Sequence, residues 1–255
     1  MKEAKDFILL ENDHINANYS RLRFTPADGS KLPEILPGQF VQVATSTPGV
    51  FLRRPISIND VDTVNQTIDL LVRKAGRGTE ALIALPERSH TNILLPLGKG
   101  FTCEAPAGAQ LLLIGGGVGV APLLYLGKAL RAKGFTPEFL LGARSAADIL
   151  ELDEFREVGP VHISTEDGTE GEKGLVTQHS VLKSEFHRYY CCGPAPMMKA
   201  VAKVAKDNGT ECEVSLENMM ACGLGACLCC VEKTVKGNVC VCTEGPVFNI
   251  DQLTW

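Results

Sequence analysis

The spacing of the cysteines near the C-terminal end constrains this chain more than any other feature. Cys222, Cys227 and Cys230 follow the pattern C-x4-C-x2-C, and Cys240 and Cys242 come within a dozen residues of the last of them. Three thiolates from one glycine-rich loop and a fourth from downstream are the ligand set of a plant-type 2Fe–2S cluster. A structural zinc site is the alternative, although such sites usually combine two C-x2-C pairs. The spacing therefore favours an iron–sulfur cluster and, with it, electron transfer.

Composition excludes several classes of function. The 255 residues are 45% hydrophobic and 22% charged, as in ordinary globular proteins, and the formal net charge is −5. We therefore expect no nucleic-acid partner, because no basic run occurs, and no membrane span, because no stretch of 18 apolar residues occurs. Ten cysteines behind an N-terminus unlike a signal peptide indicate metal ligation in a reducing compartment. The predicted location is the cytoplasm.

The first hundred residues have the pattern of an antiparallel β-structure. Short alternating runs at residues 7–10, 39–44 and 67–74 are separated by turn signals such as Pro-Ala-Asp-Gly at 26–29. No convincing helical periodicity occurs before about residue 79. Many short strands with Gly/Pro turns predict a sandwich or small barrel with a groove for a ligand.

Two segments of this region carry residues suited to a flavin nucleotide. In FLRRPISIND, the planar fork of Arg54 suits a diphosphate and the hydroxyl of Ser57 suits a flavin ring nitrogen. In LVRKAGRGTEAL, a strand runs into Gly76 and Gly78, and Thr79 is predicted to open a helix whose N–H groups hold phosphate. Taken singly, each segment is explained as well or better by a solvated basic strand or a glycine turn. Their joint appearance before the next motif favours a nucleotide site.

The periodicity changes at about residue 110. Residues 110–134 read as an apolar strand, a glycine turn and an amphipathic helix. The apolar strand that follows completes a βαβ unit, which predicts a parallel sheet. The run GGGVGVAP departs from the strict dinucleotide fingerprint, but its glycines let a pyrophosphate approach the backbone at the switch point of such a sheet. The glycines of this predicted site are Gly115, Gly116, Gly117 and Gly119.

A second strand, turn and helix follow in YYCCGPAPMMKAVAKVAKDNG. Cys192 and Gly193 would lie at the C-terminal edge of the sheet, where a nicotinamide can rest. A small buried apolar residue is an equally good interpretation of Cys192.

Taken in chain order, RRPIS, GRGT, GGGVGVAPL and CGPAPMM resemble the ferredoxin–NADP reductase superfamily. The terminal CGLGAC-x2-C with C-TEGPVF resembles one branch of it, the electron-transfer subunits of B-type dihydroorotate dehydrogenase. The resemblance covers nearly the whole chain. It implies a β plus α/β fold with an antiparallel FAD-binding β-barrel at residues 1–101, a parallel-sheet NAD-binding α/β domain at 102–210 and a small 2Fe–2S module at 211–255.

The resemblance also assigns site residues, motif by motif. Arg54 would bind the FAD diphosphate and Ser57 would lie near the flavin ring. The flavin site that it implies comprises Arg54, Pro55, Ile56, Ser57, Leu71, Val72, Arg73, Gly78 and Thr79. The implied cluster ligands are Cys222, Cys227, Cys230 and Cys242. Cys242 is chosen over Cys240 because the family's fourth ligand stands two residues before a D/E-G-P-V-F run, which leaves Cys229 and Cys240 as spare thiols.

The choice of pyridine nucleotide depends on the segment VHISTEDGTEG at residues 161–171. In the superfamily, a Ser-Arg pair in the corresponding segment favours NADP. Here Glu166 and Asp167 stand where the cation would be. A carboxylate can accept a hydrogen bond from a ribose 2′-OH but repels a 2′-phosphate. NAD is therefore the predicted nucleotide.

The function that the resemblance implies is electron transfer in pyrimidine (UMP) biosynthesis. A separate FMN-containing catalytic subunit would oxidise dihydroorotate, and electrons would pass through the 2Fe–2S cluster and FAD to NAD, in a heterotetramer of two catalytic and two electron-transfer subunits. No segment of this chain resembles a site for orotate. Two alternatives stay open: a related reductase subunit that serves a hydrogenase or ferredoxin-dependent complex, and a zinc-stabilised nucleotide-binding module without catalysis.

Overall fold

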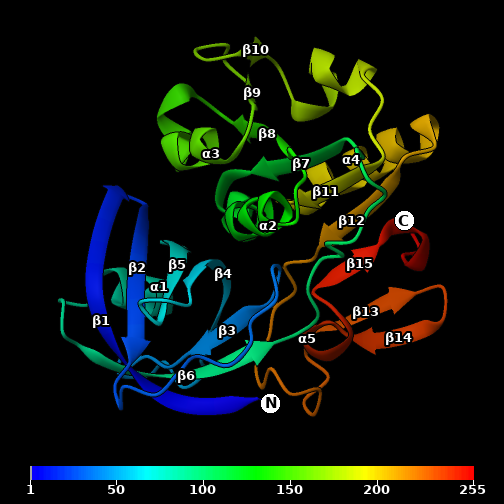
Figure 1. Ribbon diagram of the computed structural model, residues 1–255. Coiled ribbons are helices and arrows are strands. Elements are labelled where there is room, and N and C mark those ends of the chain that lie inside the picture. The colour runs from blue at the N-terminus through cyan, green and yellow to red at the C-terminus, as the bar shows by residue number, and fades with distance from the viewer. Residues whose placement is uncertain (1) are drawn as a thin grey trace.

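A computed structural model describes residues 2–255, and the chain divides into three regions (Figure 1). A β-barrel of blue and cyan strands lies lowest in this view, and a sheet with helices on both faces lies above it. A smaller orange and red region lies beside the barrel, below one end of the sheet.

Six antiparallel strands close the barrel in the order β1-β2-β5-β4-β3-β6. They are β1 (Glu3–Asn16), β2 (Tyr19–Pro26), β3 (Phe40–Val43), β4 (Arg54–Asp62), β5 (Thr67–Arg73) and β6 (His90–Leu97). Alternate side chains fill the interior, as strand geometry requires, and Phe7, Leu9 and Phe24 are fully buried there. The short helix α1 (Arg77–Ile83) follows β5 and contacts β2 and β5.

The second region is a seven-stranded sheet in the order β10-β9-β8-β7-β11-β12-β15. Its strands are β7 (Leu111–Gly116), β8 (Glu138–Ala143), β9 (Val161–Thr165), β10 (Glu172–Lys173), β11 (Arg188–Cys192), β12 (Glu211–Ser215) and β15 (Val247–Asn249). All neighbours pair in parallel except β15, which is antiparallel to β12. The predicted fold class, an antiparallel barrel followed by a parallel-sheet α/β domain, is confirmed.

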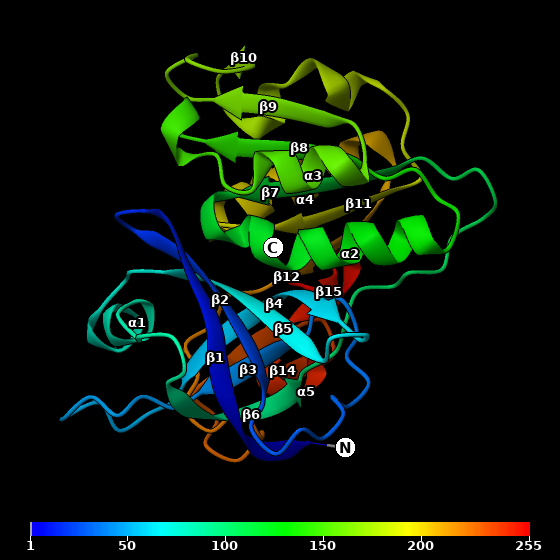
Figure 2. The ribbon, with the colours of Figure 1, turned by 60° about the vertical axis from the view of Figure 1, so that its left-hand side comes forward.

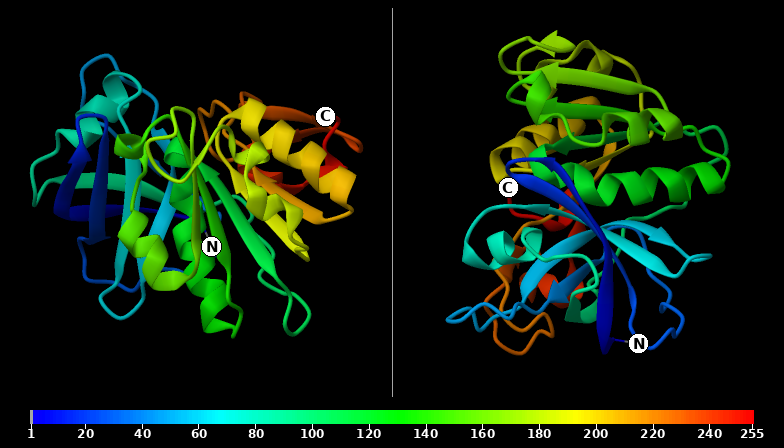
Figure 3. Two further views of the ribbon diagram at one scale, coloured as in Figure 1. Left: turned by 90° about the horizontal axis from the view of Figure 1, so that it is seen from above. Right: turned by 90° about the vertical axis from the view of Figure 1, so that its left-hand side faces the viewer.

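Helices cover both faces of this sheet (Figures 2 and 3). They are α2 (Ala121–Ala132), α3 (Leu152–Val158) and α4 (Ala195–Asn208). Side chains of β7 alternate between two cores, since Leu111 and Leu113 pack with residues of α2 and α3, whereas Leu112 and Ile114 pack with residues of α4. Burial on both faces explains why these strands are continuous apolar runs. Figure 2 shows α2 between the sheet and the barrel, where it contacts β4.

Residues 211–255 are shared between the sheet and a smaller unit. β12 and β15 belong to the sheet, whereas β13 (Val231–Thr234) and β14 (Gly237–Cys240) form a hairpin that α5 (Val241–Glu244) follows. Main-chain contact joins this unit to the end of the barrel, because the N–H of Lys99 donates to the carbonyl of Gly245 at 2.6 Å. The domain boundaries given above stay predictions. None of the helices between residues 2 and 255 has the length and apolar character of a membrane span.

Candidate flavin, nucleotide and cluster sites

A cavity of about 200 Å³ lies where the three regions meet. The predicted flavin residues that line it are Pro55, Ile56, Ser57, Leu71 and Arg73. The other two regions contribute Val118 and Ala121 after β7 and Ser215, Glu217 and Met220 before the cysteine loop. Apolar walls with a few polar groups suit a large aromatic ring such as that of a flavin. A flavin held here would be reached from the nucleotide side and from the cysteine side.

Arg54 lies over Gly78, so the two predicted flavin motifs meet in space. A Cβ at Gly78 would approach Arg54 Cδ to 2.8 Å, and glycine therefore lets the arginine stem lie close to α1. The guanidinium donates through Nε and Nη2 to the carbonyl of Leu52, at 3.2 and 2.7 Å. Arginine held in this way beside the start of a helix suits a diphosphate.

Two other predicted flavin residues have roles that the sequence pattern did not indicate. Thr79 does not open α1; the helix begins at Arg77 after Gly76, and Thr79 is its third residue. Its Oγ1 accepts from the N–H groups of Ala75 and Gly76, at 2.8 and 3.1 Å, as in a capping box. The side chain of Val72 is fully buried in the barrel core, so this residue can reach a flavin only through its backbone.

The glycine turn after β7 packs directly against the Gly-Pro turn after β11. Of the predicted residues, Gly115 and Gly116 end β7, and Gly117 and Gly119 lie in the 3-10 turn that leads into α2. Cys192 is the last residue of β11, and Gly193 follows it directly. A Cβ at Gly119 would come within 2.5 Å of Cys192 O and of the Gly193 backbone. Only glycine lets the two turns approach so closely. The structure thus brings the predicted pyrophosphate and nicotinamide residues together at the C-terminal ends of adjacent parallel strands.

Cys192 is 1% exposed, and its burial raises the pKa of the thiol well above the usual value. The thiol is therefore neutral at pH 7 and is not a reactive thiolate. It provides a small apolar surface where the nicotinamide is predicted to rest.

Glu166 lies directly after β9 and is exposed. Its N–H donates to the carbonyl of Ala143 at the end of β8, which places it at the C-terminal edge of the sheet with the nucleotide turns. Asp167 accepts from the N–H and Oγ1 of Thr169, at 2.9 and 2.7 Å, and so holds its own loop. Of the two acids, Glu166 is the one whose carboxylate faces solvent without a structural task in the loop.

The four predicted cluster ligands form two pairs. The thiol of Cys222 is within hydrogen-bonding reach of Cys227, and Cys230 is within reach of both Cys242 and the spare Cys240. No three Cys, His, Asp or Glu side chains within residues 2–255 converge as a single metal ion requires. A 2Fe–2S cluster takes two thiolates on each iron, so two separate pairs fit such a cluster better than a mononuclear zinc site.

Backbone N–H groups point at these sulfurs. Leu224 N donates to Cys222 Sγ at 3.3 Å, and Gly225 N donates to Cys242 Sγ at 3.1 Å. The donor from Leu224 lowers the pKa of Cys222 to about 6, so this residue is a thiolate at neutral pH. Desolvation raises the pKa of the buried Cys242 to about 12, with Cys230 adding to the effect. Donors already aimed at the sulfurs are the environment that an anionic sulfide cluster needs.

The two spare thiols differ in position. Cys229 is exposed, whereas Cys240 is partly buried with its Sγ 3.8 Å from the carbonyl oxygen of Gly225. Gly225 also donates to Cys242. Cys240 therefore lies next to the loop that carries the predicted ligands, and Cys229 lies on the surface of that loop.

Three residues around these sites were missed by the sequence reasoning. Glu217 and Met220 line the cavity, and their position just before the cysteine loop was an available signal. Gln42 on β3 is fully buried, and a Cβ at Gly223 of the cysteine loop would lie 3.1 Å from its Cγ. The only signal for Gln42 was an amide within an otherwise apolar strand.

Known proteins share these features over most of the chain. Residues 113–203 match the family described as the oxidoreductase NAD-binding domain. Residues 217–254 match the iron–sulfur cluster binding domain of dihydroorotate dehydrogenase B. The second match contains all four paired cysteines.

Two bacterial relatives match over most of the chain. The electron transfer subunit of dihydroorotate dehydrogenase B (NAD(+)) from Shouchella clausii is 39% identical over 224 residues, which cover 85% of this chain and 86% of the relative. The corresponding subunit from Lysinibacillus sphaericus is 41% identical over 229 residues, covering 86% and 88%. The chain belongs to this family. As a member of the dihydroorotate dehydrogenase B electron transfer subunits, it is an NAD-linked oxidoreductase subunit, and membership implies a catalytic partner subunit.

Solved structures extend the likeness to the whole fold. The NADH-dependent reduced ferredoxin-NADP oxidoreductase has a TM-score of 0.87 and 27% identity, over 98% of this chain and 90% of that one. The ferredoxin reductase of carbazole 1,9a-dioxygenase shares the fold alone, with a TM-score of 0.69 and 18% identity over 82% and 67% of the two chains. Together with the family matches, the first of these structures supports the three cofactors predicted for this dihydroorotate dehydrogenase B family member: FAD, a 2Fe–2S cluster and NAD.

Proposed function

We propose that this chain is the electron-transfer subunit of a dihydroorotate dehydrogenase B complex and acts in pyrimidine (UMP) biosynthesis. Electrons leave dihydroorotate on a partner FMN-containing catalytic subunit and reach NAD through the 2Fe–2S cluster and FAD. The observation that carries this proposal is the single cavity lined by Ser57 of the barrel, Ala121 of the nucleotide side and Met220 of the cysteine side. Flavins exchange hydrides and single electrons, which is the chemistry that such a meeting point requires.

In this proposal, each of the predicted site residues binds a different part of the flavin or the nucleotide. Arg54 binds the flavin diphosphate, and Ser57 faces the flavin ring across the cavity. The turn with Gly117 and Gly119 offers its backbone to the nucleotide pyrophosphate at the start of α2. Cys192, as a neutral thiol, packs against the nicotinamide and does not react with it.

The catalytic subunit docks over the cysteine loop in this proposal. Large apolar side chains are exposed on both sides of the ligand cysteines: Met219 is 84% exposed, Leu224 is 51% exposed and Leu228 is 64% exposed. Exposed apolar groups gathered on one short segment mark a protein interface. Docking there would cover the exposed Cys227 and shorten the path to the partner's flavin. The proposed assembly contains two catalytic and two electron-transfer subunits, and the proposed location is the cytoplasm.

Anaerobically purified protein is expected to show flavin absorption with a broad sulfide-to-iron shoulder, and NADH should bleach both. Bleaching of both chromophores requires that the nucleotide, flavin and cluster sites communicate. Added catalytic subunit and dihydroorotate should then produce NADH from NAD, and a mixture without the catalytic subunit is the control. A colourless zinc protein would contradict the proposal. Electron delivery to a ferredoxin, with none exchanged with the catalytic subunit, would favour the related reductase role instead.

Replacing Glu166 with arginine should shift the nucleotide preference towards NADPH. The change removes a carboxylate that repels a 2′-phosphate and adds a cation that attracts it, so the ratio of kcat/KM for NADPH to that for NADH should rise at least about tenfold. Glu170→Arg is the matched control, because Glu170 is an exposed acid in the same loop. An unchanged ratio in Glu166→Arg would remove this residue from the proposed ribose site.

A further inference from the structure

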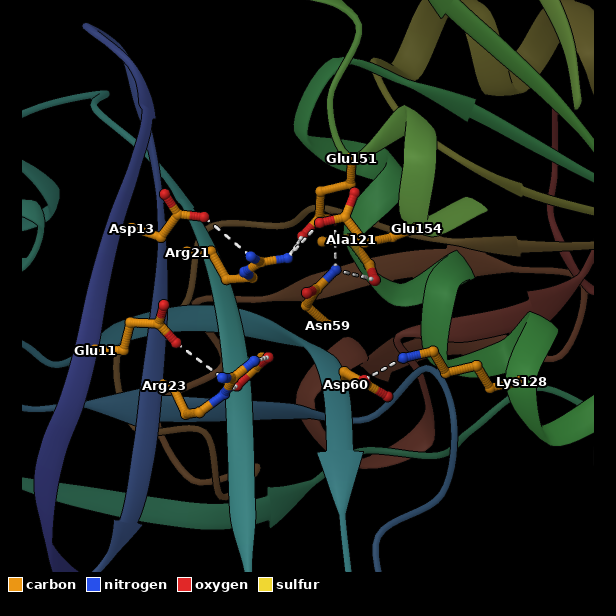
Figure 4. Close-up of polar contacts among 11 residues, drawn as sticks. Glu11, Asp13, Arg21, Arg23, Asn59, Asp60, Ala121, Lys128, Glu151 and Glu154 are labelled. Carbon is orange, nitrogen blue, oxygen red and sulfur yellow. Dashed lines mark hydrogen bonds and ion pairs between the residues drawn. The ribbon is translucent and has the colours of Figure 1, made fainter. Parts of the chain in front are cut away.

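A buried polar contact joins the barrel to the α/β domain next to the cavity (Figure 4). Asn59 lies on β4, two residues after Ser57, and is fully buried. Its Nδ2 donates to Glu151 Oε2 at 2.8 Å and to the carbonyl of Ala121 at 3.2 Å. Ala121 is the first residue of α2, directly after the glycine turn, and both Ser57 and Ala121 line the cavity. One side chain therefore ties the flavin strand to the nucleotide turn.

Glu151 is in an uncommon position for a glutamate. Its side chain has no exposed surface, and its backbone is left-handed, with φ 54° and ψ 34°, immediately before α3. Non-glycine residues adopt this conformation rarely, and they keep it where the surrounding structure holds them there. The burial and the backbone both indicate that the carboxyl group has a task at the domain interface.

The charged groups around Glu151 would stabilise its ionised carboxylate only weakly. The nearest cation within residues 2–255 is Arg21 of β2, with Nη1 at 3.7 Å from Glu151 Oε1. Arg21 is closer to Asp13 of β1, at 2.9 Å, and to Glu154 of α3, at 2.6 Å. Asp69 of β5 adds a further negative charge near Glu151. Oε1 accepts no hydrogen bond from any described residue.

Arg23 of β2 pairs with Asp69 and with Glu11 of β1, each at 2.8 Å, so the negative charge of Asp69 is itself compensated (Figure 4). Lys128 of α2 pairs with Asp60 of β4, so this second contact between the helix and the flavin strand is an ion pair of its own (Figure 4). The charges of Lys128 and Asp60 compensate each other, so Arg21 is the cation that faces Glu151.

We propose that Asn59 and Glu151 form a proton-dependent clasp that positions the nucleotide turn against the flavin strand. Asn59 makes the contact, and a proton on Glu151 keeps it closed by removing a buried, poorly paired charge. The clasp acts through backbone position, so neither residue contacts the reacting atoms. This inference rests on the proposed function, since it concerns the approach of the nicotinamide to the flavin.

The direction of the pH effect follows from burial. Desolvation raises the pKa of Glu151 from 4.5 to about 7, against the opposing effects of Asn59 and Arg21. The closed clasp therefore binds a proton more tightly than an open, solvated one. The stabilisation of the closed clasp is complete below pH 4.5 and is lost as the pH rises through about 7. Nucleotide binding should weaken over the same interval.

The test is rapid anaerobic mixing of the flavin-loaded protein with NADH, from about pH 6 to about pH 8.5, a range that brackets the raised pKa. The Kd for NADH comes from the saturation of the flavin reduction rate. For the wild type, Kd should rise on the order of tenfold across this range. Glu151→Gln should hold the low Kd throughout, because glutamine still accepts from Asn59 and carries no charge. Asn59→Leu should give the high Kd at every pH.

Lys128→Met is the matched control, because it removes the ion pair between α2 and β4 and should keep the wild-type pH profile. A Glu151→Gln variant with the wild-type pH profile would overturn the clasp, whatever the behaviour of Asn59→Leu. Infrared difference spectra give a second measurement: a protonated carboxyl band that titrates near pH 7 in the wild type should be missing in Glu151→Gln. A flavin that NADH does not reduce at any pH would overturn the proposed function. A flavin reduced with a pH-independent Kd would overturn the clasp alone.

Discussion

Replacing Cys242 with serine is expected to remove the iron–sulfur cluster and to stop electron transfer beyond the flavin. Cys242 is fully buried, faces Cys230 and accepts from Gly225 N at 3.1 Å, so its sulfur occupies the interior end of the ligand set. Iron–sulfur clusters select soft thiolates, and a serine oxygen is a poor replacement. Loss of a ligand should lower cluster affinity by more than the roughly 10–100-fold that is typical when a residue behind the ligands is replaced. Iron content and dihydroorotate-dependent NAD reduction should therefore fall together, while NADH still reduces the flavin.

Cys229→Ser is the control for this variant, since the exposed Cys229 should leave the cluster in place. Cys240 requires a second comparison because its sulfur also lies near Gly225. A cluster that survives in Cys242→Ser but disappears in the double variant with Cys240→Ser would show that Cys240 can serve as the fourth ligand. A cluster that survives in both would contradict the proposed ligand set.

Replacing Gly119 with alanine should strongly impair flavin reduction by NADH while leaving both chromophores in place. The added methyl group would lie within 2.5 Å of Cys192 O and the Gly193 backbone, so the two nucleotide turns must move apart. Misplacement of bound groups by about 1 Å typically costs on the order of 100-fold in rate. The rate of flavin reduction at limiting NADH should fall by a similar factor. Both chromophores should remain bound, because the substitution removes none of the predicted flavin-binding or cluster-ligating side chains.

Gly134→Ala provides the control for this substitution. A Cβ at Gly134 meets no atom within 4 Å, and this residue lies beyond the far end of α2 from the nucleotide turn, so the strain of alanine at its φ of 88° affects stability only. We expect wild-type NADH kinetics from this control. Normal kinetics in Gly119→Ala would show that the close approach of the two turns is not needed for nucleotide binding.

The parts of this fold that the sequence predicted are those with local signals. The change of periodicity at residue 110 marks the start of the parallel sheet, because strands buried on both faces are continuous apolar runs. The glycine turns were predicted because close backbone approach excludes larger residues. The cysteine spacing predicted a ligand loop, and the choice of Cys242 over Cys240 as the fourth ligand stays a prediction, since both thiols lie near Cys230.

The parts that were not predicted depend on distant partners. Glu151 reads in the sequence as an ordinary exposed acid at a helix start, and its buried partner Asn59 is 92 residues away. Thr79 was expected to open α1, but the glycine before Arg77 takes the N-cap position and Thr79 supports it from inside the helix. Val72 belongs to the same motif as Leu71, yet strand alternation turns its side chain into the barrel core.

The short strands at the two ends of the seven-stranded sheet affect how this protein can assemble. β10 has two residues and β15 has three, and they flank the longer strands at either edge. A long exposed edge is a template for another chain to add a strand, and natural proteins often blunt such edges with very short strands. Strand addition to this sheet is therefore disfavoured at both ends. A partner must therefore bind through side-chain surfaces, so a surface that recognises a partner does not also expose the apolar sheet to aggregation.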